Sequence, residues 1–204
     1  MKHALVIAII AIASSASAQS IFIQGSAGAD MRRFSAEPEK SAFDGTAKTF
    51  AVAVGSEFIP HWVVSGEFDS GGRATRSTIT SVVISGQSTD IHNSYTSERR
   101  SISALAGYRT GGHRLVRIGY YGGVSFSTLR REIVSDAESI VLHSPAPGSV
   151  YEQRLTSAIV GVDVAIRAGA HLAIVPAFRA QPLTIGTELG GRSVRPSIGA
   201  RVSF

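Results

Sequence analysis

The chain of 204 residues contains no cysteine. This absence excludes a disulfide framework, a thiolate metal site and a cysteine nucleophile. Charged residues make up only 17% of the chain and aromatic residues 7%, whereas there are 21 glycines. Such a composition, low in charge, is not that of a disordered protein. Hydrogen bonding and burial must therefore hold the fold together without covalent links.

Long apolar runs are also missing. The longest, residues 4–13, covers about half of the roughly 20 residues that a membrane-spanning helix needs, which argues against a helical anchor. Lys2 and His3 precede this run, and the small residues Ala16 and Ala18 follow it with the spacing of a signal peptidase site. We predict a signal peptide over residues 1–18 and one domain over residues 19–204. Any further membrane contact must come from strands.

Alternation of apolar with polar or small residues is abundant, and its period of two is that of a β-strand. The predicted strands lie near residues 21–31, 47–58, 61–70, 95–109, 114–129, 151–167, 171–181 and 194–204. Short turns rich in Gly and Pro alternate with long connections over residues 32–46, 71–94, 130–150 and 182–193. This layout predicts an all-β fold, an eight-stranded antiparallel up-and-down transmembrane β-barrel with both termini at the short-turn, periplasmic end.

A soluble β-sandwich is the alternative that the same alternation allows. In the barrel register the aromatic residues separate into two levels, as expected at the two surfaces of a bilayer. The level at the short turns holds Phe58, Trp62, Tyr108 and Phe204, and the level at the long loops holds Phe34, Phe50, Phe68, Phe126 and Phe178. This separation favours the membrane barrel.

Charged residues fall on the opposite faces of the strands and are predicted to point into the lumen. They are Asp30, Glu57, Glu67 and Asp163 with Arg109, Arg117, Arg167, Arg179, Arg195 and Arg201. Eight strands enclose a space that side chains can fill, so we predict a closed lumen, which disfavours a narrow porin. An unpaired buried charge costs several kcal/mol. We therefore expect Glu57 to pair with Arg109, Arg117 or Arg201.

The signal peptide, the eight strands, the alternating loop lengths and the terminal Phe204 together resemble the small Gram-negative outer-membrane β-barrel family that includes the OmpA transmembrane domain and OmpX. The resemblance implies export through the periplasm, insertion by the barrel-assembly machinery with Phe204 as part of the signal, and residence among outer-membrane lipids. It implies no single activity, because the family includes structural proteins, adhesins and lipid-modifying enzymes. We expect a monomer with a structural or surface-interaction role and no cofactor.

Catalytic candidates are few. His92, Ser94 and Glu98 have the residue types of a hydrolase triad, in which a base activates a nucleophile and an acid orients the base. His92 and Ser94 weakly resemble the His-x-Ser element of outer-membrane lipid A deacylases, although the sequence that follows this element in that family is absent. A lipid A-modifying enzyme is therefore the alternative function. Solvated loop residues are the simpler interpretation, and no spacing indicates a metal site.

Arginine dominates the basic residues, with 17 Arg among 20 Lys and Arg. Those near the long-loop ends of strands are Arg32, Arg33, Arg73, Arg76, Arg99, Arg100, Arg130 and Arg131. Guanidinium groups match phosphate oxygens in a bidentate manner, so we predict a basic collar that binds lipopolysaccharide, with a solvated rim as the alternative. The pI near 10.0 does not indicate nucleic acid binding in an exported membrane protein.

The run Ile79–Ile84 within the connection 71–94 is rich in β-branched residues. It predicts a hairpin that continues above the membrane. An exposed edge for pairing with a partner strand is the alternative use of such a run.

Overall fold

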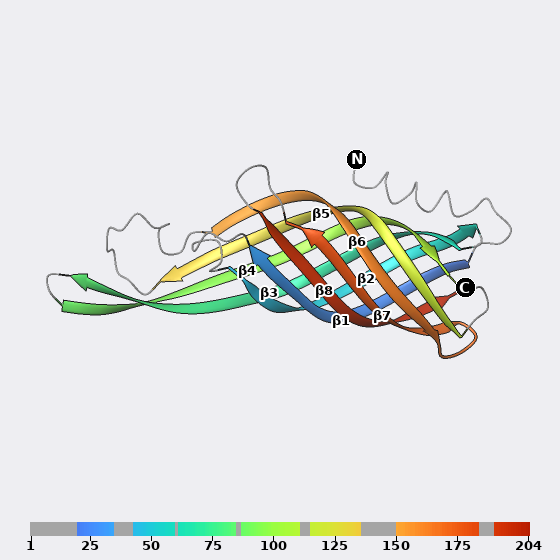
Figure 1. Cartoon of the computed structure of the whole chain (residues 1–204), viewed down its shortest axis with the longest axis horizontal. Coiled ribbons are helices and arrows are strands. Elements are labelled where there is room, and N and C mark those ends of the chain that lie inside the picture. Colours follow the sequence, from blue (N-terminus) through green and yellow to red (C-terminus); the bar gives the residue numbers. More distant parts are fainter. Residues whose placement is uncertain are drawn as a thin grey trace.

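A computed structural model describes residues 20–34, 43–59, 61–84, 87–110, 115–135, 150–183 and 190–204. The predicted signal peptide, residues 1–18, lies outside the described residues. The eight strands form a closed barrel in which each strand pairs with its neighbours in the chain and β8 pairs with β1. All these pairings are antiparallel. The structure confirms the predicted eight-stranded up-and-down barrel (Figure 1).

The strands run longer than the alternation predicted, mainly at the long-loop end. Their bounds are β1 Ser20–Phe34, β2 Gly45–Ile59, β3 Trp62–Ile84, β4 Gln87–Arg109, β5 Val116–Ser135, β6 Val150–Arg167, β7 Leu172–Pro182 and β8 Gly191–Ser203. The short turns connect β2 to β3, β4 to β5 and β6 to β7 at one end. The described part of the chain contains no helix of the length and apolarity needed to cross a membrane.

The β3–β4 hairpin projects far beyond the other strands (Figure 1). Its two strands stay paired from Trp62 and Tyr108 out to Ile84 and Gln87, with a register shift between Gly71 and Ala74. The pairing of β3 with β2 ends at Gly71, so the outer half of β3 has left the barrel wall. The prediction of a connection over 71–94 was therefore wrong, whereas the predicted extension of the hairpin is confirmed.

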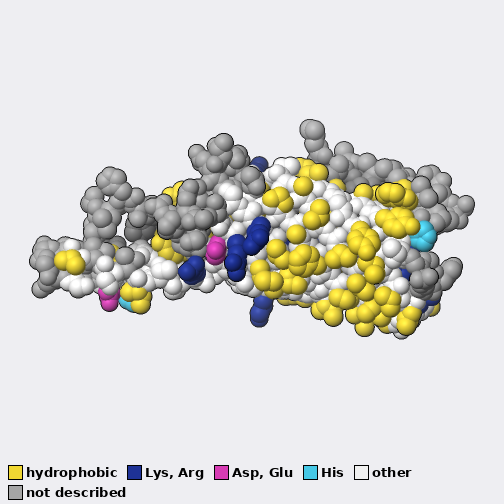
Figure 2. Space-filling model, viewed as in Figure 1, with side chains coloured by type: hydrophobic (Ala, Val, Ile, Leu, Met, Phe, Trp, Pro, Cys, Tyr) yellow, Lys and Arg dark blue, Asp and Glu magenta, His cyan; other side chains and the backbone are white. Residues whose placement is uncertain are grey.

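Exposed apolar side chains cover much of the outer face of the barrel, and we call them the apolar belt; Figure 2 shows one side of it. Exposed side chains on it include Phe50, Val52, Phe68, Ile102, Tyr120, Phe126, Val160, Phe178 and Ile198. Trp62, Tyr108 and Phe204 are exposed at the short-turn end, which confirms two aromatic levels. Phe34 is an exception, because β1 continues through it and its side chain is buried inside the barrel, only 7% exposed.

Candidate functional site

The lumen is filled by side chains, and its most densely charged layer surrounds Asp30 of β1. The Oδ2 atom of Asp30 accepts hydrogen bonds from the Nε atoms of Arg32 at 2.9 Å and Arg99 at 3.0 Å. Ser193 donates to Oδ1 at 2.5 Å. The side chains of Asp30, Arg32 and Arg99 are fully buried. One carboxylate therefore holds together strands β1, β4 and β8 across the lumen.

Asp69 of β3 forms the second centre of this layer. Its Oδ1 lies 2.5 Å from Arg99 Nη2, and its Oδ2 lies 2.5 Å from Arg195 Nη1 and also accepts from Ser101. Glu67, two residues earlier on the same face, lies 3.5 Å from Arg195 Nη1 and 3.4 Å from Arg179 Nε. We call Asp30, Glu67 and Asp69 with Arg32, Arg99, Arg179 and Arg195 the central ionic layer. It contains three carboxylates and four guanidinium groups.

Backbone groups complete the hydrogen bonding of Arg32 within the central ionic layer. The terminal nitrogens of Arg32 donate to the carbonyl oxygens of Ser97 at 2.7 Å, Gly71 at 2.8 Å and Gly72 at 2.9 Å. A side chain at Gly71 would collide with the Asp30 carboxylate and with Arg32 Nη2. Glycine at this position lets the ion pair pack directly against the wall of the barrel, so this buried charge is satisfied by protein groups.

Two apolar clusters lie on either side of the central ionic layer. Toward the hairpin end the cluster consists of Phe34, Phe43, Leu129, Ile133, Leu155 and Leu183. Toward the short turns it consists of Phe22, Val63, Leu105, Tyr121 and Ile159. The guanidinium of Arg179 lies 5.0 Å from the centre of the Tyr121 ring, which joins the ionic layer to the second cluster. This sequence of layers closes the lumen to an open aqueous path, as the sequence predicted.

Glu57 anchors a second ionic group near the short turns. It lies 3.1 Å from Arg109 Nη1 and 2.5 Å from Arg117 Nη2, so two of the three predicted partners are confirmed. The third, Arg201, instead bonds Asp163 at 2.5 Å and the Gln24 side-chain oxygen at 2.6 Å. Arg167 is exposed at the mouth of the barrel.

Two residues of the predicted arginine collar do not lie on the outer face. Arg32 and Arg99 are 1% and 0% exposed, inside the central ionic layer. Arg131 is half-buried, with its guanidinium 5.3 Å from the Phe43 ring centre and 6.0 Å from that of Tyr151. The physical reason is strand geometry, because adjacent residues point to opposite faces. Of each neighbouring Arg pair, one side chain faces out and the other faces in.

The outward basic residues form a rim next to the apolar belt. We call this set the outer basic rim: Arg33, Lys48, Arg73, Arg76, Arg100, Arg130, Arg154 and Arg192. Figure 2 shows basic side chains gathered at the border of the belt, on the side of the projecting hairpin. The sequence prediction missed Lys48, Arg154 and Arg192. Continuing the alternation of β2, β6 and β8 beyond their apolar residues would have found them.

The strand pairing places some rim charges beside like charges. Arg33 of β1 lies directly opposite Arg192 of β8. Arg100 of β4 and Arg154 of β6 both lie opposite Thr128 of β5, one on each side. Arg130 of β5 differs, since it lies between Glu98 and Glu152. Positive charge is therefore concentrated at Arg33 and Arg192. At the second place Glu98 pairs with Arg100, so only Arg154 has no ion pair among the described residues.

The structure does not support the catalytic alternative. His92, Ser94 and Glu98 share one face of β4, but an extended strand places Glu98 about 20 Å from His92 and about 13 Å from Ser94. Glu98 instead accepts hydrogen bonds from Arg100 at 2.8 and 3.1 Å. A triad requires contacts of about 3 Å. These three residues cannot act together on one substrate atom.

Comparisons with known proteins agree with this geometry. No family model matches the sequence, and no curated protein matches it. Solved structures do match. They include Neisserial surface protein A (TM-score 0.59, 16% identity, covering 92% of this chain and 100% of that one) and a major outer membrane protein of Thermus thermophilus (TM-score 0.54, 13% identity, 92% and 100%). The outer membrane protein OprG of Pseudomonas aeruginosa also matches (TM-score 0.54, 12% identity, 93% and 97%). The chain therefore has the fold of the small outer-membrane β-barrels.

Proposed function

We propose that this protein is an integral outer-membrane protein with a closed lumen and a structural or surface-interaction role, and that its outer basic rim binds the phosphate groups of lipopolysaccharide. The observation that carries the proposal is the position of the rim. Basic side chains border the apolar belt on the side of the projecting hairpin (Figure 2). With the belt in the bilayer and the hairpin outside the cell, this border is the headgroup region of the outer leaflet.

The charge arrangement of the rim favours an anionic partner. Like charges directly opposite on neighbouring strands destabilise a sheet, and Arg33 and Arg192 are such a pair. A phosphate between two guanidinium groups removes the repulsion and accepts bidentate hydrogen bonds from both. Arg154, which lies across Thr128 from Arg100, offers a second phosphate contact. Each exposed contact is worth about 1 kcal/mol or less, so several must act together.

The test replaces Arg33, Arg100, Arg154 and Arg192 with Gln and measures the lipopolysaccharide that co-purifies with the protein from outer membranes. We expect less bound lipopolysaccharide, and the remainder should depend less on salt. The matched control replaces the same four residues with Lys, which retains the charge but loses the bidentate geometry, and should have an intermediate effect.

Assembly of each variant is checked by its heat-modifiable migration in gels, since a closed barrel resists detergent until it is heated. If the folded Gln variant binds as much lipopolysaccharide as the unmodified protein, the rim is only a solvated surface. Recovery of the unmodified protein in the soluble periplasmic fraction would refute the membrane assignment itself.

A further inference from the structure

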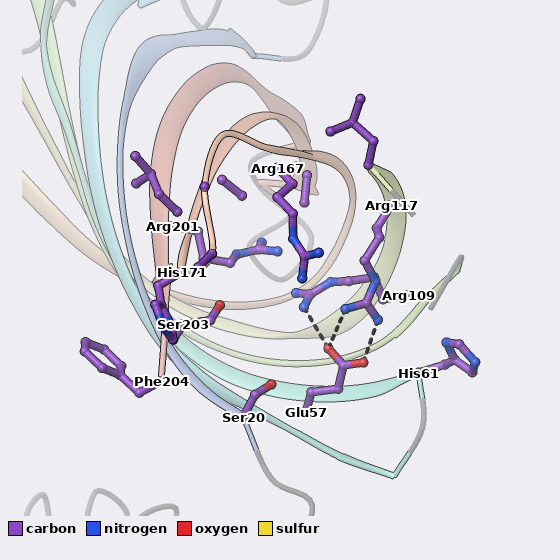
Figure 3. Close-up of a pocket in the computed structure, with 16 residues that line it drawn as sticks. Ser20, Glu57, His61, Arg109, Arg117, Arg167, His171, Arg201, Ser203 and Phe204 are labelled. Carbon is purple, nitrogen blue, oxygen red and sulfur yellow. Dashed lines mark hydrogen bonds and ion pairs between the residues drawn. The ribbon is translucent and has the colours of Figure 1, made fainter. Parts of the chain in front are cut away.

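A cavity of about 670 Å³ occupies the short-turn end of the lumen. Its volume falls within the range of small-molecule sites, about 300 to 1,000 Å³. Glu57, Arg109, Arg117, Arg167 and Arg201 contribute to its lining. Figure 3 shows the guanidinium groups of the four arginines directed into the interior from different strands, with Glu57 below them. The cavity therefore gathers positive charge at one end of a closed barrel.

The carboxylates of this region do not balance its guanidinium groups. Glu57 is shared by Arg109 and Arg117, and Asp163 is the partner of Arg201. No ion pair of Arg167 is found among the described residues. Four guanidinium groups thus meet two carboxylates, which leaves a surplus of two positive charges. In the central ionic layer, by contrast, three carboxylates meet four guanidinium groups.

Two residues of the cavity lining also have hydrogen-bond donors that the protein leaves unused. Arg109 and Arg201 have side chains that are 5% and 4% exposed. Within the described part of the chain, Arg109 Nε and Arg201 Nη1 are buried and have no hydrogen-bond partner. Buried N–H groups in native proteins are nearly always satisfied. Both residues line the cavity, so these two donors can bind acceptor oxygens of a molecule that enters it.

We propose that this cavity, the basic mouth of the barrel, binds a soluble anion with two or more negative charges carried by phosphate or carboxylate groups. A dianion neutralises the surplus charge, and its oxygens can accept from Arg109 Nε, Arg201 Nη1 and the guanidinium of Arg167. A lipid headgroup is not the ligand, because these side chains point into the lumen while lipid contacts the outer wall. Leu115, Leu172 and Ala173 line the same cavity and leave space for an apolar part of the ligand.

The basic mouth is separate from the outer basic rim, and its ligand need not resemble the partner of the rim. The site is argued from the structure alone. Only the statement that it faces the periplasm depends on the membrane orientation proposed above. A ligand that enters there would come from the periplasmic side and would not pass through the lumen, because the apolar cluster and the central ionic layer close it.

The experiment uses protein refolded from inclusion bodies into a neutral detergent, which keeps lipopolysaccharide out of the sample. Pyrophosphate and succinate, one probe of each anion class, are titrated by calorimetry. Arg167→Gln removes an exposed side chain with no ion pair among the described residues, so the barrel should still fold. We expect anion affinity to fall on the order of tenfold, because one charge-assisted hydrogen bond is lost. Arg130→Gln makes the same charge change on the outer wall, at a position between Glu98 and Glu152, and should leave binding unchanged.

A second variant, Arg201→Gln, should also weaken binding if its gel migration shows a folded barrel. Binding of pyrophosphate alone, of succinate alone or of both would support the site and identify the anion class. The proposal is overturned if neither probe binds at millimolar concentration. It is equally overturned if Arg167→Gln leaves binding unchanged, or if Arg130→Gln weakens it as much, since the effect would then be one of general surface charge.

Discussion

Replacing Asp30 with Asn tests whether the central ionic layer holds the barrel together. The substitution keeps the size of the side chain but removes its charge. Arg32 and Arg99 both donate to the Oδ2 atom of Asp30, at 2.9 and 3.0 Å. In the Asp30→Asn variant a neutral amide oxygen at the Oδ2 position accepts from both guanidinium groups only weakly, and the amide nitrogen faces the Ser193 hydroxyl in place of Oδ1. The layer, already one carboxylate short, would lose a second counter-charge.

The expected cost follows from burial. The side chains of Asp30, Arg32 and Arg99 are 0% exposed, and breaking a buried ion pair by removing one partner costs about 3 to 5 kcal/mol. The control is Glu98→Gln, which breaks the ion pair with Arg100 on the outer face, where the side chains are 24% and 66% exposed. Exposed pairs are worth about 1 kcal/mol or less.

Urea unfolding in phospholipid vesicles measures both variants, with the fluorescence of the single tryptophan, Trp62, as the signal. Trp62 is 49% exposed on the outer wall and reports directly on its transfer from lipid to water. The double variant Asp30→Asn with Arg32→Gln should lose less stability than the sum of the two single variants, because it leaves fewer unpaired charges. A loss for Asp30→Asn no greater than that for Glu98→Gln would refute the structural role of the layer.

Three further predictions use neighbouring features. Arg32→Gln should lower the urea midpoint strongly and Arg33→Gln hardly at all, since only Arg32 is buried; similar midpoints would contradict the assigned faces. In planar bilayers the filled lumen should show no large stable conductance, and channels of nanosiemens size would contradict the closure. Deleting residues 78–93 shortens the hairpin above the barrel wall and should preserve heat-modifiable migration, whereas loss of assembly would show that the hairpin supports the wall.

The architecture was predictable from the sequence because one physical pattern determines most of it. A strand that separates lipid from a charged lumen must alternate, and the alternation fixes the strand number, the order and the faces. The strand ends were not predictable in the same way. Beyond the apolar belt both faces of β1 and β3 become largely polar, so the alternation weakens while the backbone pairing continues to Phe34 and Ile84.

The lumen was predictable in composition but not in its pairings. Asp69 lies two residues after Glu67 on the same face of β3. The two-residue period of the strand could therefore have predicted that Asp69 points into the lumen. The contact between Arg99 of β4 and Asp30 of β1 could not have been predicted in this way, because the two strands are not neighbours in the wall. Their approach depends on the stagger of the whole barrel, which no single strand encodes. The cavity at the mouth is a property of the same stagger.

The adjacent arginines show how strongly the register is specified. Each of the pairs 32–33, 99–100 and 130–131 directs one guanidinium inward and one outward. A slip of one residue in β1 would exchange them. Arg32 would then enter the rim, its bonds to the carbonyl oxygens of Ser97 and Gly71 would be lost, and Asp30 would face lipid as a bare charge. The free-energy cost of exposing the unpaired Asp30 carboxylate to lipid alone exceeds any free energy gained by adding Arg32 to the rim. The same dipeptides thus link closure of the lumen to the display of charge at the membrane surface, and neither can change without the other.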